Sequence, residues 1–407
     1  MIKIKINFRI YIIIIIVFFL IFLTGCWDRT EPEDQALFIV GGYDYNPEKN
    51  MYKIIGSIEN MTFEGGGSGN VSDAPPFWVV SAWGETSTDA IANISKKVSK
   101  NINYNHLHLL LLSETIAKNK GIIPVMDSLA RSKQSRPIVE IAVVKGNLEK
   151  MIKGSIPIEN TIGLGLIKQI KTNKKRLGTA ITQDARQFLQ KLSAPGIEAV
   201  AVCLELINEE SQKEESNSDS KPQKDQKPFV KMSGLAAFYK DKMVGFLNDR
   251  EARGWNWISE QKANGIINVL YPGNEEKVSI NCKRTFVKIK PYFIDEKPQI
   301  KVELEVEGRF ETITGNSNIK EKSYLTQSLE NRLAEAIRND IKLSLEKAKK
   351  LRTDIFGFGN SFYRLKYNHW KSMESEWDEI FVNLPVKIEV KTTIKRAGLI
   401  NKGIVVQ

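Results

Sequence analysis

The chain has 407 residues, of which 42% are hydrophobic and 26% are charged, and its formal net charge is +11 at pH 7. This balance excludes a disordered or fibrous chain, and the length exceeds what one core usually holds, so we expect two or three domains. No run of basic residues interleaved with aromatic ones occurs in the sequence, so nothing indicates a nucleic-acid partner.

The N-terminus has the three parts of a secretory signal. An uncharged, apolar run covers residues 10–23, and it follows three basic residues, Lys3, Lys5 and Arg9. The run is shorter than the roughly 20 residues that a membrane span needs. It ends in Leu23-Thr24-Gly25-Cys26, which resembles the lipobox of bacterial lipoproteins. We therefore predict a lipoprotein signal peptide over residues 1–25, with an uncleaved anchor or an ordinary signal peptide as alternatives.

The lipobox resemblance implies that Cys26 becomes an S-diacylglycerol cysteine, with further N-acylation as an option. Two acyl chains hold a protein durably on a membrane, whereas one holds it weakly. The mature body would then lie at the outer face of the cell membrane. Its net charge would be +8, because three basic residues leave with the signal (11 − 3). Such a body is drawn toward an anionic leaflet by about 1 kcal/mol per well-placed Lys or Arg; the alternative is a Lys-rich solvated surface.

The other cysteines and the histidines indicate no cofactor. Cys203 and Cys282 lie in strand-like segments without a C-x-x-C spacing, so zinc and redox motifs are absent. Either a disulfide or two separate buried thiols fits them, and we favour the thiols. His106 and His108 would share one face of a strand, but no third ligand is indicated nearby. The sequence therefore predicts no metal site.

The N-terminal half alternates strand and helix patterns. Strands are expected at residues 37–44, 52–58, 77–83, 107–112, 138–144 and 199–207, and helices at 86–102, 122–130 and 183–192. The first two strands would form a hairpin, and Thr86 would cap the first helix. The glycine-rich stretch 65–70 is a loop that lacks the Gly-Lys-Ser/Thr ending of a phosphate site. This pattern predicts an α/β region over residues 26–208, either undivided or split into two subdomains near 155–180.

A polar segment, residues 209–227, follows. It contains only Glu, Ser, Gln, Lys, Asn, Asp and Pro. Such a segment cannot bury enough apolar surface to offset its ordering entropy. We interpret it as a linker or an exposed loop and as the main boundary in the chain.

Residues 228–407 have the pattern of an α+β domain. A hairpin at 234–247 and a helix at 248–258 lead to an alternating strand at 300–310, a long amphipathic helix at 329–351 and a last strand at 386–394. We expect an antiparallel sheet backed by one long helix. The whole chain is thus predicted to be a multi-domain α+β protein with mixed and antiparallel sheets and packed helices.

For several aromatic and glycine residues in this half, a structural role and a binding role are both considered. Trp255 and Trp257 cannot share one face of a helix, so one of them could be exposed as a partner anchor. Trp370 and Trp377 are seven residues apart, which fits one helical face in the core. Gly357-Phe358-Gly359 fits a turn better than a ligand loop.

Four stretches together resemble the Ger(x)C family, the lipoprotein C subunits of bacterial spore germinant receptors. They are Gly25-Cys26-Trp27-Asp28-Arg29 with Val40-Gly41-Gly42-Tyr43-Asp44, then residues 234–247 (GLAAFYKDKMVGFL), then Thr353-Asp354-Ile355-Phe356-Gly357-Phe358-Gly359, and last His369-Trp370 with residues 377–381 (WDEIF) and 394–400 (IKRAGLI). Their order and spacing fit over nearly the whole mature chain. The long insert at 209–227 and Tyr43 depart from the usual family pattern.

The resemblance implies a non-enzymatic subunit that assembles with A and B subunits in the spore inner membrane, where the complex responds to small nutrient germinants. The family has no known catalytic residues, and Cys26 is the position whose chemistry carries over. A solute-binding lipoprotein of a transporter is the alternative, but it would need two α/β lobes. A hydrolase is disfavoured, because neither G-x-S-x-G nor H-E-x-x-H occurs.

Overall fold

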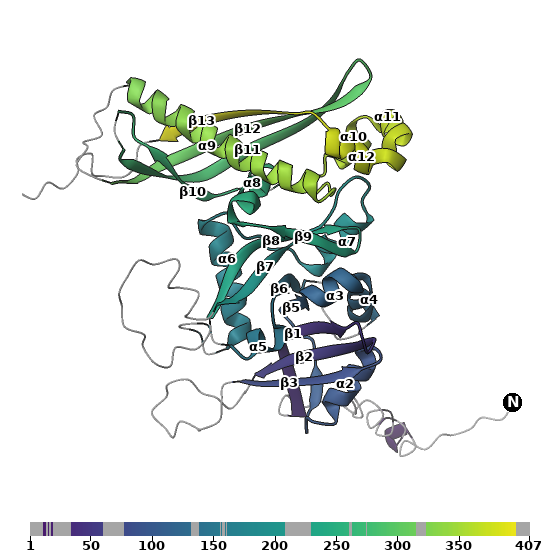
Figure 1. The fold of residues 1–407 in the computed structure, drawn as a ribbon. Coiled ribbons are helices and arrows are strands. Elements are labelled where there is room, and N and C mark those ends of the chain that lie inside the picture. The colour runs from purple at the N-terminus through teal and green to yellow at the C-terminus, as the bar shows by residue number, and fades with distance from the viewer. Residues whose placement is uncertain are drawn as a thin grey trace, which may run out of the picture.

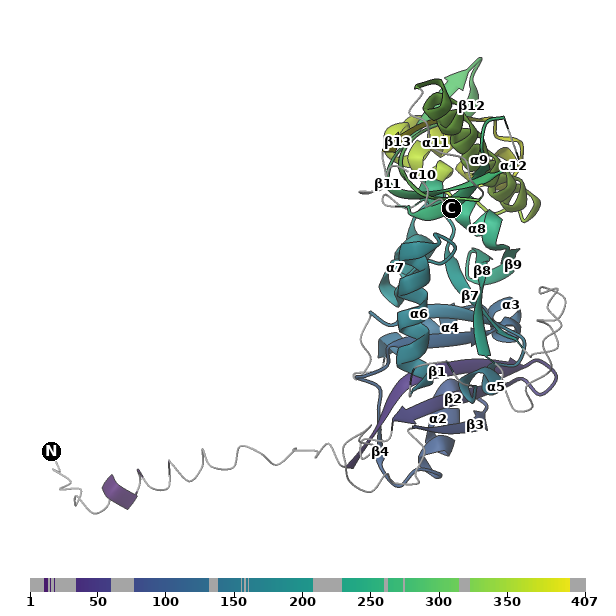
Figure 2. The ribbon, with the colours of Figure 1, turned by 90° about the vertical axis from the view of Figure 1, so that its left-hand side faces the viewer.

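The computed structural model describes residues 34–395, except 60–76, 132–137, 155, 157, 158, 160, 208–228, 260–262, 274 and 315–322, together with residues 11–13, 15 and 18. Two β-sheets form the body (Figure 1). The larger sheet occupies the lower part of the molecule. The smaller sheet lies across its upper end with a long helix beside it, and Figure 2 shows the same stacking from the side.

The larger sheet has nine strands in the order β3-β2-β1-β5-β6-β7-β8-β9, with β4 paired to β1. The bounds are β1 (Gln35–Asn46), β2 (Met51–Glu59), β3 (Phe77–Gly84), β4 (Asn101–Asn103), β5 (Leu109–Ser113), β6 (Glu140–Lys145), β7 (Val200–Ile207), β8 (Phe229–Tyr239) and β9 (Lys242–Leu247). The central strands β1, β5, β6 and β7 are parallel, and the flanking pairs are antiparallel. The predicted hairpins β1–β2 and β8–β9 are confirmed.

Helices cover both faces of this sheet, which explains the continuous apolar runs in its central strands. In β5, Leu109 to Leu112 are all fully buried. Residues of α2 (Ser87–Ser95), α3 (Glu114–Asn119), α4 (Ile123–Arg131) and α7 (Ala185–Ser193) join the core on one face. Those of α5 (Leu148–Ile152) and α6 (Ile162–Arg176) join the core on the other. Helix α6 lies within residues 155–180, where a split into two subdomains was expected. It contacts β1 and also β10 (Gly265–Leu270). The split itself stays a prediction.

Helix α2 begins as predicted but ends earlier. The Thr86 side chain accepts a hydrogen bond from the Asp89 amide at 3.1 Å and so caps the helix. The predicted continuation to Ile102 is wrong, because the helix ends at Ser95 and Ile102 lies in β4, opposite Ala36. Val98, in the connection after α2, and Ile102, in β4, still pack against the same core. Their spacing therefore resembled that of one helical stripe.

The polar segment 209–227 and the glycine stretch 65–70 lie outside the described residues. The strands on either side of the polar segment are antiparallel neighbours, with Ile207 opposite Phe229. The larger sheet therefore continues beyond this segment and ends at β9, twenty residues further along the chain.

The second layer consists of a four-stranded sheet and its helices. Its elements are α8 (Asp249–Ser259), β10 (Gly265–Leu270), β11 (Lys277–Ile294), β12 (Lys297–Ile313), α9 (Ser323–Lys350), α10 (Phe358–Leu365), α11 (Tyr367–Met373), α12 (Trp377–Asn383) and β13 (Val386–Lys395). The long helix α9 covers one face of the sheet, as predicted (Figure 1). The expectation of a purely antiparallel sheet is wrong in one pairing: β13 runs parallel to β12, because α9 to α12 return the chain to the end where β12 begins.

The alternative in which Trp255 or Trp257 is exposed as a partner anchor is contradicted by the structure. Both indoles are buried, at 1% and 0% exposure. Helix α8 packs against α9 on one side and against β8, β11 and β12 on others, and the residues that it leaves exposed, Asp249 and Arg250, lie at its start. Trp255 donates its indole hydrogen to the Ile355 carbonyl at 2.8 Å. These indoles stabilise the contact between the two layers and are not available to a partner.

Cys203 and Cys282 are free and buried, in agreement with the prediction of two separate thiols. Burial raises the pKa of each thiol to about 12. Neither is therefore ionised near neutral pH, which makes both unreactive.

Candidate functional site: the junction between the two sheets

The junction is built by the segment Thr353-Asp354-Ile355-Phe356-Gly357, which leads out of α9. Arg352 has a positive φ of 54°, and the Thr353 amide donates back to the Ala348 carbonyl at 3.1 Å, so the long helix ends sharply here. Gly357 has a φ of 73° and opens α10. Glycine suits this conformation because it has no side chain to clash.

Asp354 is the central residue of the junction. It is 4% exposed, and its carboxylate accepts four hydrogen bonds. One oxygen accepts from the amides of Gly357 (2.9 Å) and Phe358 (3.1 Å), and the other accepts from the Gly359 amide (2.8 Å) and the Trp377 indole (3.1 Å). The carboxylate thus satisfies the free amides at the start of α10 and fixes the position of α12.

The same segment is hydrogen-bonded to the larger sheet through main-chain groups. The Glu198 amide donates to the Asp354 carbonyl at 3.0 Å, and the Asn360 amide donates to the Gly196 carbonyl at 2.7 Å. The Thr353 hydroxyl donates to the Phe238 carbonyl of β8. These bonds join α9 and α10 to the turn before β7 and to β8, so the two sheets are held in one relative position.

Two glycines allow the layers to approach closely at this point. A Cβ built on Gly359 would lie 2.7 Å from the Gly196 Cα and 2.7 Å from the Trp377 ring. A Cβ on Gly196 would lie 2.5 Å from the Gly359 carbonyl carbon, and Gly196 also has a φ of 64°. Only the absence of both side chains permits main-chain contact here.

Aromatic rings enclose the junction on the side of the small helices. Trp370 and Trp377 are both buried, as predicted, and their ring centroids lie 5.3 Å apart. They do not share one helix, because α11 ends at Met373 and a short 3-10 turn separates it from α12. Phe362 meets Trp377 edge-on at 5.7 Å. The rings exclude water from the Asp354 carboxylate.

Acidic groups surround the outer rim of the junction. Glu198 accepts a hydrogen bond from the Lys240 amide at 2.7 Å, and the Tyr239 hydroxyl donates to Asp378. Burial, with the charges of Asp378 and Asp354, raises the pKa of Glu198 to about 7, although the Lys240 amide opposes the shift. Burial likewise raises the pKa of Asp354 to about 6 against the effect of its four donors.

These raised pKa values predict that unfolding depends on pH. Between about pH 5 and 7 the folded chain holds protons on Glu198 and Asp354 that the unfolded chain has released, so the free energy of unfolding should fall as pH rises. We expect a decrease on the order of 2–3 kcal/mol between pH 5.5 and 8. Urea unfolding at these two pH values measures it. Glu198→Gln should flatten the dependence; a midpoint that rises with pH would contradict the assignment.

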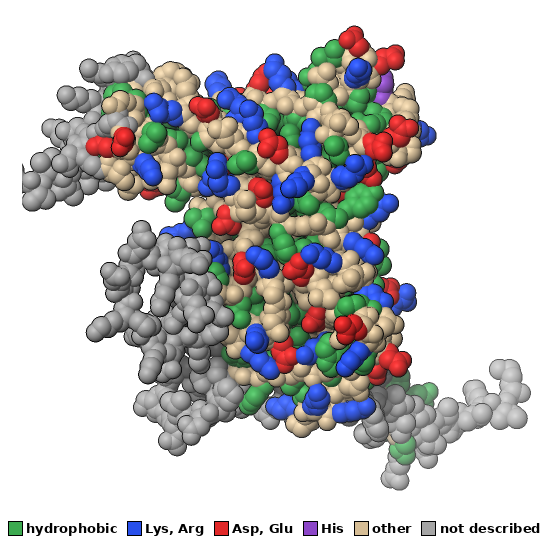
Figure 3. Space-filling model, in the orientation of Figure 1, with side chains coloured by type: hydrophobic (Ala, Val, Ile, Leu, Met, Phe, Trp, Pro, Cys, Tyr) green, Lys and Arg blue, Asp and Glu red, His purple; other side chains and the backbone are tan. Residues whose placement is uncertain are grey.

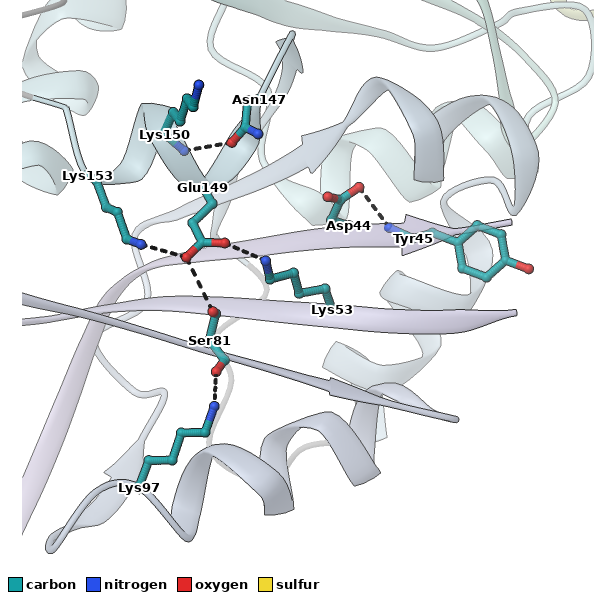
Figure 4. A network of polar contacts seen from close by, with 9 residues as sticks. All are labelled: Asp44, Tyr45, Lys53, Ser81, Lys97, Asn147, Glu149, Lys150 and Lys153. Carbon is teal, nitrogen blue, oxygen red and sulfur yellow. Dashed lines mark hydrogen bonds and ion pairs between the residues drawn. The ribbon is translucent and has the colours of Figure 1, made fainter. Parts of the chain in front are cut away.

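A second polar network lies lower in the body and has a structural role (Figure 4). Glu149 of α5 pairs with Lys53 of β2 and with Lys153 at 2.7 Å, and it accepts a weaker bond from Ser81 of β3. Hydrogen bonds from Lys153 and Lys53 lower the pKa of Glu149 to about 2. The network attaches α5 to the edge of the larger sheet.

The structure tests some of the site residues predicted from the sequence and does not describe others. Cys26 lies outside the described residues, so the structure does not test lipid attachment. Gly357-Phe358-Gly359 is not the predicted turn as a whole, because Gly357 is the N-cap of α10 and Phe358 and Gly359 are the first two residues of that helix. His106 and His108 flank Leu107, and within the described ranges no three His, Cys, Asp or Glu side chains form a metal-binding group. None of the helices in the part of the chain searched is long and apolar enough to cross a membrane.

The sequence analysis missed Asp354 as the organising group. It also missed Gly196. No capping pattern marked Asp354, because it lies three residues before Gly357, the N-cap of α10, whereas the usual capping side chain is at the N-cap itself.

Two family models match the chain. "Spore germination protein N-terminal domain" matches residues 28–206, and "Spore germination B3/ GerAC like, C-terminal" matches residues 233–398. The second match includes the junction segment, and the two meet across the polar segment 209–227.

Individual proteins similar to this chain are also spore germination proteins. Spore germination protein KC of Bacillus subtilis (strain 168) is 26% identical over 388 residues, covering 94% of this chain and 95% of its own. Spore germination protein B3 of the same organism is 25% identical, covering 95% and 97%. The crystal structure of the GerBC protein has a TM-score of 0.53 and 19% identity, covering 87% of this chain and 96% of that one, which shows a shared fold.

The fold and these matches together define a spore germination protein. More narrowly, the chain belongs to the Ger(x)C family, the family of germinant receptor C subunits.

Proposed function

We propose that this chain is a lipid-anchored, non-enzymatic subunit of a germinant receptor, held on the outer face of the spore inner membrane through Cys26. It would act through contacts with the A and B subunits, and the complex would respond to small nutrient germinants. The observation that carries the proposal is the position of Leu23-Thr24-Gly25-Cys26, because the N-terminal family model begins at residue 28, two residues after the cysteine. The mature chain would thus consist almost entirely of family domains.

The junction supports a role as a rigid scaffold. Both oxygens of the Asp354 carboxylate are used by structural hydrogen bonds, and the aromatic rings fill the core. A tether raises the effective concentration of a weak partner to about millimolar, so a modest interface with membrane subunits would suffice. The alternative, a solute-binding lipoprotein, is not favoured, because the second layer is a four-stranded sheet with one long helix and not a second α/β lobe.

The anchor is tested by Cys26→Ala. We expect the variant to lose incorporation of a fatty-acid probe and to be left uncleaved or mislocalised, because the alkylated thiol is gone. Cys203→Ala, which removes a buried thiol, is the control and should be labelled like the parent. Equal labelling of Cys26→Ala and the parent would end the lipoprotein assignment.

The receptor role is tested in spores. Deleting the gene should abolish the response to the germinants of its own receptor and leave other receptors unaffected. Loss of optical density after germinant addition measures the response, and re-expression of the parent chain restores it. An unchanged response to every germinant tested, with normal levels of the sister subunits, would overturn the proposal.

A further inference from the structure

We propose that one end of this protein rests on an anionic phospholipid surface. This end, which we call the basal surface, is formed by the edge strand β3, helix α2 and the short strand β4, and its defining residues are Trp78, Lys96, Lys97, Lys100 and Asn101. The inference rests on the lipid anchoring proposed above and adds the orientation of the body and the class of lipid that it meets.

The first observation is unpaired positive charge. Lys96 donates to the Asn93 side chain at 2.8 Å, and Lys97 donates to the Ser81 carbonyl at 2.7 Å. Both acceptors are neutral, and among the described side chains none of the three basal lysines has a carboxylate partner. By contrast, the nearby Lys53 is already paired with Glu149. Figure 3 shows basic side chains gathered along the lower edge of the body.

The second observation concerns the edge strand. Trp78 is 46% exposed on β3, and a half-exposed indole is typical of the water–lipid interface. The edge itself is covered, because Lys97 and the Asn93 amide donate to the carbonyls of Ser81 and Trp83 at 2.7 and 3.0 Å. A strand of a protein partner would need those carbonyls. A lipid surface does not, so the arrangement favours lipid over an added strand.

The third observation is a recess beside the lysines, with a volume of about 540 Å³. Its polar lining is neutral and comes from Gln35, Ser95, Asn101, Asn103 and Asn105. Amide and hydroxyl groups suit the phosphate oxygens and hydroxyls of a lipid headgroup, while the adjacent lysines supply the charge.

The fourth observation is the place where the body starts. Gln35, the first residue of β1, pairs with Asn101 of β4 at the basal surface (Figure 2). Eight residues, 27–34, lie between it and Cys26, and the nine steps from one Cα to the next reach at most about 31 Å. Residues 27–34 carry a net charge of −3, from four acidic residues and one arginine, so the tether itself is not attracted to an anionic leaflet. The basal lysines must supply that attraction.

The test uses the full lipidated chain in vesicles of phosphatidylcholine, with or without phosphatidylglycerol. An environment-sensitive fluorophore is placed on Ser95→Cys at the basal surface, and on Lys297→Cys at the opposite end of the body, where β12 begins (Figure 1). A lipid-borne quencher reports contact. We expect strong quenching at position 95 only in vesicles with phosphatidylglycerol, and little at position 297 in either.

Replacing the three basal lysines by glutamate should shift the ratio of docked to undocked protein by about a hundredfold and abolish the difference between the vesicles. Lys168→Glu with Lys371→Glu, two exposed lysines elsewhere, is the charge control and should behave like the parent. Equal quenching of position 95 in both vesicles, or unchanged quenching in the triple variant, would overturn the inference.

Failure of the anchor is seen separately, as missing acyl mass on Cys26. A body without acyl chains can be held on the same vesicles by an N-terminal histidine tag and a nickel-chelating lipid, whether or not residues 1–25 are cleaved, so the fluorophore measurement keeps its meaning. The two proposals can therefore fail independently of each other.

Discussion

Asp354→Ala should lower the free energy of unfolding by about 4 kcal/mol or more, because it leaves four buried donors without an acceptor. Asp354→Asn should lose less. Its amide oxygen can still accept from two donors, but its NH₂ group would face the other two. Urea unfolding followed by tryptophan fluorescence is the measurement, and loss of the folded protein on expression counts as the same result for Asp354→Ala.

The control is Glu376→Ala, which removes an exposed acidic side chain at the N-cap position of α12 that makes no capping hydrogen bond. It should change stability by less than about 0.5 kcal/mol. If Asp354→Asn were as stable as Glu376→Ala, the carboxylate would not organise the junction.

Gly359→Val should separate the two layers at their closest approach. The new side chain would enter the space held by the Gly196 main chain and the Trp377 ring, both 2.7 Å from the Cβ position. Overpacking of this kind costs about 1–3 kcal/mol or more. In spores, the misplaced layer should also reduce the germination response even where the protein still accumulates, since a scaffold depends on the relative position of its surfaces.

Arg364→Val provides the comparison, because it adds a β-branched residue to an exposed position of the same helix, α10. Helix propensity alone should cost it about 0.5 kcal/mol. Equal stability and equal germination for Gly359→Val and Arg364→Val would contradict the close-contact explanation.

Sequence patterns were sufficient where one element determines its own structure. The hairpins, the long helix α9 and the buried run of β5 follow from local periodicity and turn chemistry, and all were predicted. The Thr86 cap was equally local.

The patterns failed where distant elements decide the environment. Trp255 and Trp257 point in different directions from one helix, and only the packing of α8 between two layers buries both. The parallel pairing of β13 depends on where α9 and the small helices α10 to α12 return the chain. Asp354 gains its role from Trp377, 23 residues away, and from amides that become unsatisfied only when α10 forms. Contacts between residues so far apart leave no periodic pattern in the sequence.

The adjacency of β7 and β8 has a practical consequence. Ile207 and Phe229 are paired neighbours, so whatever joins them leaves and re-enters the body at nearly one point. A fluorescent protein or epitope inserted within 209–227 would therefore need only closely spaced ends of its own, and the strand pairing on either side would not have to change. This position offers a labelling site for counting and locating the subunit in single dormant spores without altering either terminus.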